Sequence, residues 1–180
     1  MITGYSADLP ADCLLDSGVL YIGSNIVGVS RGGLQFDPGK TYSQIKFDGQ
    51  RSPIKGLDRV ASYDAKISGT LLEFGTEERP WLEPGSTNDS GTPTDTTTMK
   101  AAGVILASGD YQANVRLVFE RGGGKYAAVL FPYALCSQYT LKGNDGDAAE
   151  IAVTFEARLS VGAGGTGECP YKIELRDALP

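Results

Sequence analysis

Residues 151–159 impose the strongest constraint on the fold, because apolar and polar positions alternate there without a break. Successive side chains of a β-strand point to opposite faces, so this stretch predicts a strand with one buried and one solvated face. A second stretch of this kind spans residues 63–74. One face of the first stretch carries Ile151, Val153, Phe155, Ala157 and Leu159, and the other carries Ala152, Thr154, Glu156 and Arg158.

Most of the remaining chain divides into short apolar or alternating segments separated by Gly, Asn and Asp turns. We expect strands over residues 19–22, 26–29, 41–47, 101–107, 111–120, 126–131, 135–141 and 171–175. Residues 126–131 are apolar on both faces, which is typical of a strand buried on both sides. The pattern predicts a mostly β protein, an antiparallel β-barrel or sandwich.

One short flanking helix is expected over residues 76–82. Thr76 suits its N-terminal cap, and Pro80 limits it to a turn or two. We expect this helix to lay Trp81 and Leu82 over the end of a sheet.

A chain of 180 residues is long enough for one domain with its own core. We expect an N-terminal arm over residues 1–17, a β domain over 18–159 and a Gly-rich C-terminal tail over 160–180. Residues 85–98 are rich in Thr, Ser and Gly and predict a mobile loop. Residues 50–62 have mixed charge and predict an exposed loop.

The residue types present disfavour an enzyme. Histidine is absent, which removes the commonest general base and metal ligand. Cys13, Cys136 and Cys169 are odd in number and widely spaced, which favours reduced thiols over a disulfide framework. Residues 162–167 fit a dinucleotide-binding glycine pattern, but Glu168-Cys169-Pro170 starts no helix behind it. We therefore expect no catalytic residues, no metal and no cofactor.

The net charge of −6 is unevenly distributed. Residues 31–60 carry six basic and three acidic side chains, whereas residues 61–120 carry four basic and nine acidic ones. A net acidic chain is poorly suited to gripping nucleic acid, and such polarity suits contacts between copies of one chain. The sequence has no apolar run of membrane-spanning length and no signal-peptide pattern at its start, so we expect synthesis in the cytoplasm.

Six segments carry a family resemblance when they are read in order. They are residues 18–23, 47–57, 67–73, 118–121, 131–134 and 149–159. Together they resemble the major tail tube protein of long-tailed (siphovirus-type) bacteriophages, a relative of the inner-tube proteins of contractile tails and type VI secretion. The resemblance covers roughly residues 18–159 and leaves out the Thr-rich loop and the Gly-rich tail.

The resemblance implies a structural virion protein. Six subunits would form a ring, and rings would stack into a hollow tail tube around the tape measure protein, between the tail terminator and distal tail proteins. Double-stranded DNA would pass through the tube without being recognised. The protein would be assembled in the host cytoplasm and end in the virion tail.

Two sets of residues are candidates for these roles. The solvated strand faces predict a channel lining, and the basic 50–62 region predicts contacts between rings. For Arg158 we expect a salt bridge to a neighbouring subunit. The lumen-facing candidates are Asp64, Lys66, Ser68, Thr70, Thr154, Glu156 and Arg158. The ring-stacking candidates are Asp48, Arg51, Lys55, Asp58 and Arg59.

Two other functions remain open at this point. A monomeric β-barrel that binds a small apolar ligand would need an apolar interior pocket and closed edges. An enzyme that works through carboxylates would need two of them facing each other across a substrate.

Overall fold

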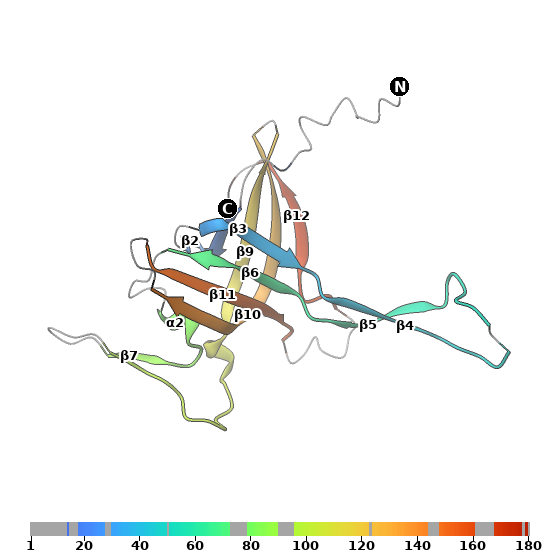
Figure 1. The fold of residues 1–180 in the computed structure, drawn as a ribbon, viewed down its shortest axis with the longest axis horizontal. Helices are drawn as coiled ribbons and strands as arrows, with labels where there is room; N and C mark the ends of the chain where they lie inside the picture. Colours follow the sequence, from blue (N-terminus) through green and yellow to red (C-terminus); the bar gives the residue numbers. More distant parts are fainter. Residues whose placement is uncertain are drawn as a thin grey trace.

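The computed structural model describes residue 14 and residues 18–27, 30–49, 51–72, 79–89, 96–122, 124–143, 148–160, 168–177 and 179. These residues form an antiparallel β structure with almost no helix (Figure 1). The expected mostly β, antiparallel class is confirmed, but the described strands do not close into a barrel.

Eight strands form the main sheet, in the order β2-β1-β9-β10-β11-β6-β3, with β12 paired to β10. Two pairs, β4–β5 and β7–β8, stand apart as two-stranded sheets. The elements are β1 (Val19–Ile22), β2 (Asn25–Ile26), β3 (Ser30–Asp37), β4 (Lys40–Gln44), β5 (Asp58–Tyr63), β6 (Lys66–Leu71), α2 (Arg79–Leu82), β7 (Thr87–Asp89), β8 (Thr96–Thr98), η1 (Ser108–Asp110), β9 (Gln112–Arg121), β10 (Lys125–Lys142), β11 (Glu150–Arg158) and β12 (Lys172–Arg176).

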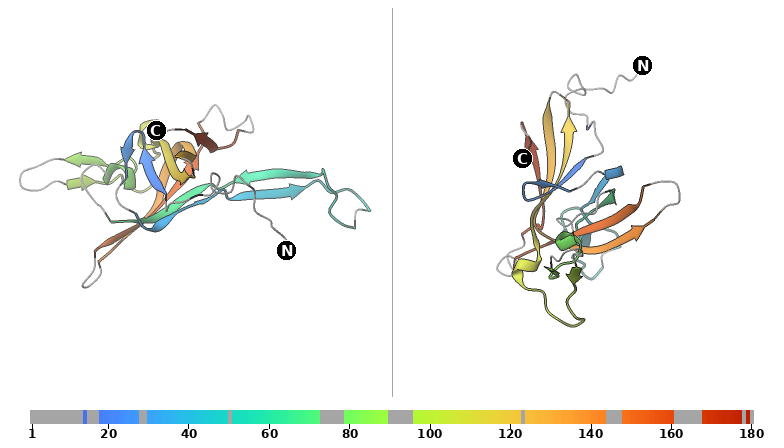
Figure 2. Two further views of the ribbon diagram at one scale, coloured as in Figure 1. Left: turned by 90° about the horizontal axis from the view of Figure 1, so that it is seen from above. Right: turned by 90° about the vertical axis from the view of Figure 1, so that its left-hand side faces the viewer.

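Strand β10 organises this sheet, because its 18 residues belong to two halves of it. Its first half pairs with β9 and β12, and its second half pairs with β11. Tyr133 lies opposite Arg158 of β11, and Leu130 lies opposite Lys172 of β12. Strands β11 and β12 therefore follow one another along the same edge of β10, and the two halves of the sheet cross (Figures 1 and 2).

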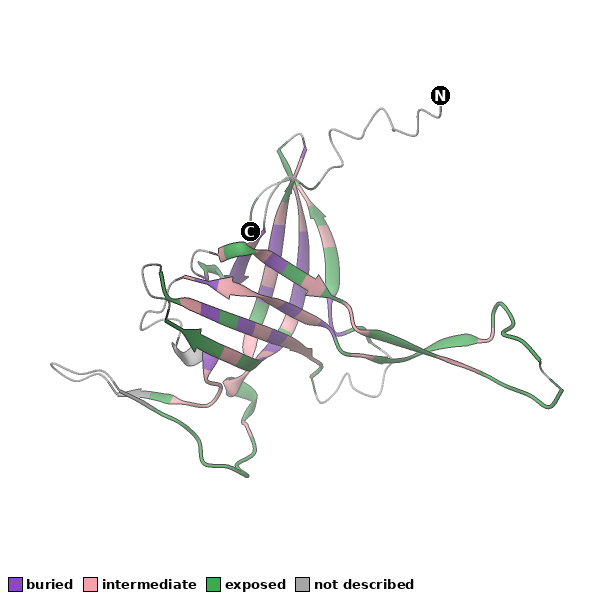
Figure 3. Cartoon of the chain, viewed as in Figure 1, coloured by how far each residue is buried: buried purple, intermediate pink, exposed green. Residues whose placement is uncertain are grey.

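The core lies between the two halves of the sheet. Phe131 of β10 and Phe155 of β11 are fully buried at its centre. The dry face predicted for residues 151–159 is confirmed for Ile151, Val153 and Phe155, whereas Leu159 is exposed and lies beyond the end of β11. Purple bands on the crossing strands in Figure 3 follow this alternation.

The C-terminal segment contributes to the same core. Tyr171 is buried and packs edge-to-face against Phe36 and Tyr63, at ring-centroid distances of 5.0 and 6.1 Å. Strand β12 follows directly and extends the sheet, as expected for residues 171–175. The described part of the Gly-rich tail is thus integral to the domain.

Strands β4 and β5 form an arm, residues 40–63, that projects from the body of the molecule (Figure 1). The arm continues the β3–β6 pair, because Asp37 lies opposite Lys66 and Lys40 lies opposite Tyr63. Between these pairs the ribbon bends at Gly39, whose N–H donates to Asp37 Oδ1 at 2.9 Å and whose carbonyl accepts from the N–H of Asp64 at 3.0 Å.

Other expectations had mixed outcomes. Helix α2 is shorter than expected, but Leu82 is buried and Trp81 packs on the core, as predicted. Residues 101–107 contain one turn and no strand, and residues 58–62 of the expected loop belong to β5. The expected loop 85–98 contains the β7–β8 pair, because Thr-rich segments also suit strands. The expected arm over residues 1–17 lies outside the described residues except for Leu14, which bridges to Arg121.

Gly39 tests the anchoring of the arm. Its φ is +51°, and a Cβ at this position would lie 2.1 Å from the carbonyl oxygen of Asp64. Gly39→Ala should lower the free energy of unfolding by roughly 1–3 kcal/mol or more, from backbone strain and this clash. Gly49→Ala is the control, because Gly49 has φ +87° but no atom near its added Cβ. Equal losses in chemical denaturation would show that the close approach at Gly39 is unimportant.

Candidate functional site

The polar face, defined here as the solvated face of β11, β6 and β3, gathers most of the lumen-facing candidates. Thr154 lies opposite Ser68, Glu156 lies opposite Lys66, and Ala152 lies opposite Thr70. These positions alternate with buried Ile67, Leu71 and Phe155, so the core holds the polar face in place. Asp64 precedes β6 and joins the set through Lys66.

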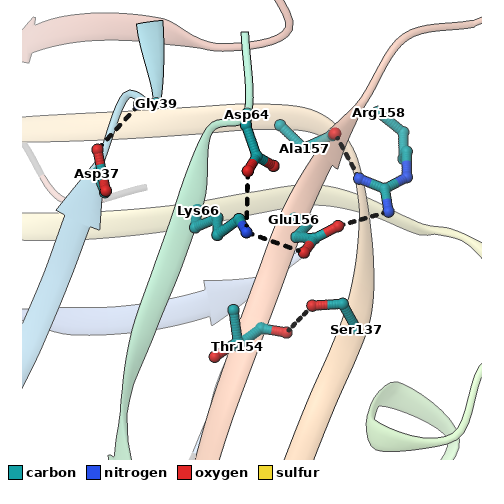
Figure 4. Close-up of polar contacts among 9 residues, drawn as sticks. All are labelled: Asp37, Gly39, Asp64, Lys66, Ser137, Thr154, Glu156, Ala157 and Arg158. Atoms are coloured by element: carbon teal, nitrogen blue, oxygen red, sulfur yellow. Dashed lines mark hydrogen bonds and ion pairs between the residues drawn. The ribbon is translucent and has the colours of Figure 1, made fainter.

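An ion-pair network centres on Glu156 (Figure 4). Glu156 accepts a hydrogen bond from Arg158 at 2.7 Å and lies 3.4 Å from Lys66 Nζ. Lys66 Nζ also lies 3.0 Å from Asp64. Two basic side chains thus share two carboxylates within one chain. Arg158 thus has a carboxylate partner within its own strand, and the salt bridge expected to a neighbouring subunit stays a prediction.

The network shifts the pKa values of Glu156 and Lys66. The hydrogen bond from Arg158 lowers the pKa of Glu156 against the opposing effect of burial, and Ser137 and Lys66 lower it further. Hydrogen bonds to Asp64 and Glu156 raise the pKa of Lys66. The shifted pKa values of Glu156 and Lys66 therefore favour the charged forms of these two groups.

Strand β3 adds residues to the polar face that sequence reasoning missed. Arg31, Gln35 and Asp37 lie opposite Thr70, Ser68 and Lys66. Arg31 pairs with Glu150 of β11 at 3.1 Å. The Gly32-Gly33 pair forms a bulge inside β3, after which the alternation resumes. Apolar and polar residues alternate on both sides of the two glycines, and this pattern could have predicted that one strand runs through them.

The polar face consequently has hydroxyl and amide groups along its middle and paired charges toward its ends. Neutral groups separate the Arg31–Glu150 pair from the Glu156 network. Phosphate binding depends on basic side chains that can replace counterions. Basic groups that are already paired with carboxylates replace few counterions of a phosphate backbone. Such a face can therefore lie beside a polyanion without binding it tightly.

All five ring-stacking candidates lie on the arm and are exposed. Asp58 and Arg59 belong to β5, while Asp48, Arg51 and Lys55 lie in the connection between β4 and β5. Arg59 donates a hydrogen bond to Ser43 Oγ across the arm at 2.9 Å. The structure thus brings this set together at a distance from the polar face.

The arm also exposes large apolar side chains, which sequence reasoning did not single out. Tyr42 lies opposite Val60 and is 64% exposed. Ile45 and Phe47, just beyond β4, are more than half exposed. The alternation of apolar with basic residues over 45–47 predicted that the strand continues to Phe47, but β4 ends at Gln44. Ile45 and Phe47 therefore lie beyond the strand, and no described residue covers them.

Other titratable groups serve the fold. The hydrogen bond to Glu83, at 2.5 Å, and partial burial raise the pKa of Tyr139 to about 12 and tie β10 to the residue after α2. Burial raises the pKa of the Cys136 thiol to about 11, so Cys136 is a poor nucleophile at neutral pH. The part of the chain that the structure describes contains no group of three Cys, Asp or Glu side chains placed to hold a metal ion.

Comparisons with known proteins leave the family open. No protein-family model matches the chain, and no curated protein matches it significantly. Among the described residues, no helix is both long and apolar enough to cross a membrane.

Replacing Glu156 tests whether pairing masks the basic groups. Glu156→Gln leaves Arg158 without its carboxylate and Lys66 with Asp64 alone, so duplex DNA should bind more tightly at low salt and be released as salt rises. Fluorescence anisotropy of a labelled duplex measures this. Glu120→Gln, which makes the same charge change at an exposed position of β9, is the control. An equal effect of both variants would mean that net charge alone matters.

The same carboxylate predicts a pH dependence. Because the folded-state pKa of Glu156 lies below its ordinary value of 4.5, its pairing stabilises the fold above that value. This stabilisation is lost as the pH falls from about 5 through the lowered pKa. The difference in unfolding free energy between the wild type and Glu156→Gln should therefore shrink over this range in denaturant titrations. A constant difference would contradict the pairing.

Proposed function

We propose that this protein is a structural subunit that assembles into rings and stacked tubes, as the tail tube proteins of long-tailed bacteriophages do. The single observation that carries the proposal is the combination, in one subunit, of a self-neutralised polar face and an arm that leaves apolar side chains in water. A tube subunit needs a surface that lines the channel and an element that joins it to other copies.

The polar face is the proposed channel lining. Lys66, Arg158 and Arg31 each have a carboxylate partner within the same chain. A channel lined by such groups would let DNA slide, because no run of unpaired cations would hold its phosphates. The proposed passage is therefore non-specific.

The arm is the proposed connector between copies. An isolated two-stranded hairpin is at best marginally stable in water, and the arm buries few of its own apolar side chains. Its five basic and two acidic side chains give it a net charge of +3, whereas the rest of the chain, with 11 basic and 20 acidic side chains, carries −9. Opposite charge on the two parts favours association between copies.

Electron microscopy of the purified protein in negative stain tests the proposal directly. Rings or hollow tubes are expected. A monodisperse monomer at all accessible concentrations would refute the proposed assembly and would favour the alternative, a monomeric protein that binds a small ligand. Tubes formed without nucleic acid would further show that DNA is cargo and not a scaffold.

Charge reversal on the arm should block elongation of the tubes. Arg51→Glu, Lys55→Glu and Arg59→Glu together turn the arm from +3 to −3, which sets it against the acidic remainder of the chain. The fold should be retained, because all three side chains are exposed and lie outside the core. Sedimentation velocity and circular dichroism measure assembly and folding. Tubes of normal length from a folded triple variant would contradict a stacking role for these residues.

A further inference from the structure

The arm meets the body of the molecule at a joint where the strand ladder is interrupted. The pairing of β3 with β6 stops at Asp37, and the pairing of β4 with β5 starts at Lys40. Pro38 lies between them and has no N–H to donate, and the carbonyl of Gly39 accepts one hydrogen bond, from Asp64. In the described part of the chain, β4 and β5 pack extensively only on each other. A two-stranded ribbon with so few links at its base needs a further contact to keep one direction.

Tyr171 contacts both strands of the arm at this joint. Its ring packs edge-to-face against Tyr63 at 6.1 Å and against Phe36 of the body at 5.0 Å. Lys40 Nζ lies 5.7 Å from the centre of the Tyr171 ring and 5.9 Å from that of Tyr63, where the face of an aromatic ring attracts a cation. A hydrogen bond to Tyr171 raises the pKa of Lys40. One side chain therefore joins the first residue of β4 and the last residue of β5 to the body.

The C-terminal segment holds this ring in place from the side of the body. Pro170 is buried directly before Tyr171 and fixes a backbone dihedral there. Strand β12 follows directly and pairs with β10 from Lys172 to Arg176. A hollow of about 490 Å³ separates Pro170 from Ser62 at the base of β5, and both residues line it. The ring of Tyr171 therefore bridges two parts of the chain that stand apart beside it.

A small change of angle at the joint becomes a large displacement along the arm. At about 3.3 Å per residue, Gln44 at the end of β4 lies about 13 Å from Lys40, so a rotation of about 20° moves it by about 5 Å. The core of a protein interface is packed as closely as a protein interior, and a displacement of this size disrupts such packing. An arm that joins copies therefore needs a fixed direction.

We propose that residues 168–177 form a strap that fixes the direction of the arm, with Tyr171 as the positioning residue. The consequence for assembly rests on the proposed function, because only an arm that joins copies has to meet each of them in the same geometry.

The strap also couples the C-terminal segment to the arm. Among the described strands, β12 pairs with β10 alone and so is linked along one edge only. Elements with few contacts open at a lower free-energy cost than the whole fold. Opening of β12 would withdraw Tyr171 from the joint and release the arm, whereas a closed β12 keeps the arm in one direction.

Pulsed electron–electron double resonance tests the strap in the full chain, in dilute protein before assembly. Nitroxide labels on p-acetylphenylalanine replace Asp58, which lies opposite Gln44 on the arm, and Glu120 on β9 of the body, both of which are exposed. One narrow distance distribution is expected. Tyr171→Ala should widen it by about 5 Å or more, the displacement that a rotation of about 20° gives at this distance. A distribution that is already broad without this substitution would overturn the strap.

Tyr139→Ala is the matched control. Tyr139 also packs on the core, but it lies in the second half of β10 and hydrogen-bonds to Glu83. Its loss should lower stability and leave the distribution narrow, and equal widening by both variants would show general loosening and overturn the strap. If Tyr171→Ala does not fold, Lys40→Ala decides, because Lys40 is exposed and outside the core. An unchanged distribution in that variant would then overturn the proposal.

Two proline variants test the anchoring by β12. Successive N–H groups of a strand point to opposite edges, so of Ile173→Pro and Glu174→Pro one removes a hydrogen bond to β10 and the other faces the edge without a described strand. Amide hydrogen exchange of β12 identifies the first, which should open the strand and widen the arm distribution. The second should leave both unchanged. An opened β12 with a narrow arm distribution would overturn the coupling.

The outcomes separate the strap from the proposed function. An arm that is fixed, and that loosens in Tyr171→Ala, in a protein that forms no ring or tube would support the strap and overturn the tube. Tubes from a protein whose arm has no fixed direction before assembly would support the tube and overturn the strap. A loose arm in a protein that stays monomeric would overturn both.

Discussion

The whole structure depends on the pairing along β10. One strand of 18 residues supplies edges to β9, β11 and β12, and the two halves of the sheet can cross only because they share it. Phe131 in its middle is fully buried between the halves. A bulge between Cys136 and Gln138 changes the register just beyond this point, which adds local twist where the strand leaves the first half of the sheet.

This dependence explains which features could be predicted from the sequence. The alternation of residues 151–159 depends only on the period of a strand, so the solvated positions Thr154, Glu156 and Arg158 were assigned to one face correctly. The opposite positions of β6 followed from the same rule. The pairing of these two strands, by contrast, is a long-range choice that no local pattern encodes. The continuity of β10 through Pro132 was missed, because proline normally breaks the ladder of a central strand.

The ion pairs of the polar face also fall into two kinds, those that follow from local sequence spacing and those that require long-range strand pairing. Alternation predicts that Glu156 and Arg158 lie on one face, two residues apart, and their ion pair follows from that spacing. The pairing of Glu156 with Lys66 requires the β6–β11 register, and that of Arg31 with Glu150 requires β3 at the sheet edge. These pairs are partly exposed and screened by solvent, so each contributes little to stability. Their larger effect is to remove cationic groups from the face without removing polarity.

The arm shows why charge alone was an incomplete guide. Its basic side chains were visible in the sequence, but a charged surface stays solvated at little cost and does not by itself require a partner. The exposed side chains of Tyr42, Ile45 and Phe47 favour a partner, because apolar area left in water costs roughly 25 cal/mol per Å² of free energy relative to burial. A hairpin anchored by the close contact at Gly39 holds these groups away from their own core. Among the described residues nothing covers these groups, and on the proposed self-association a second copy would bury them.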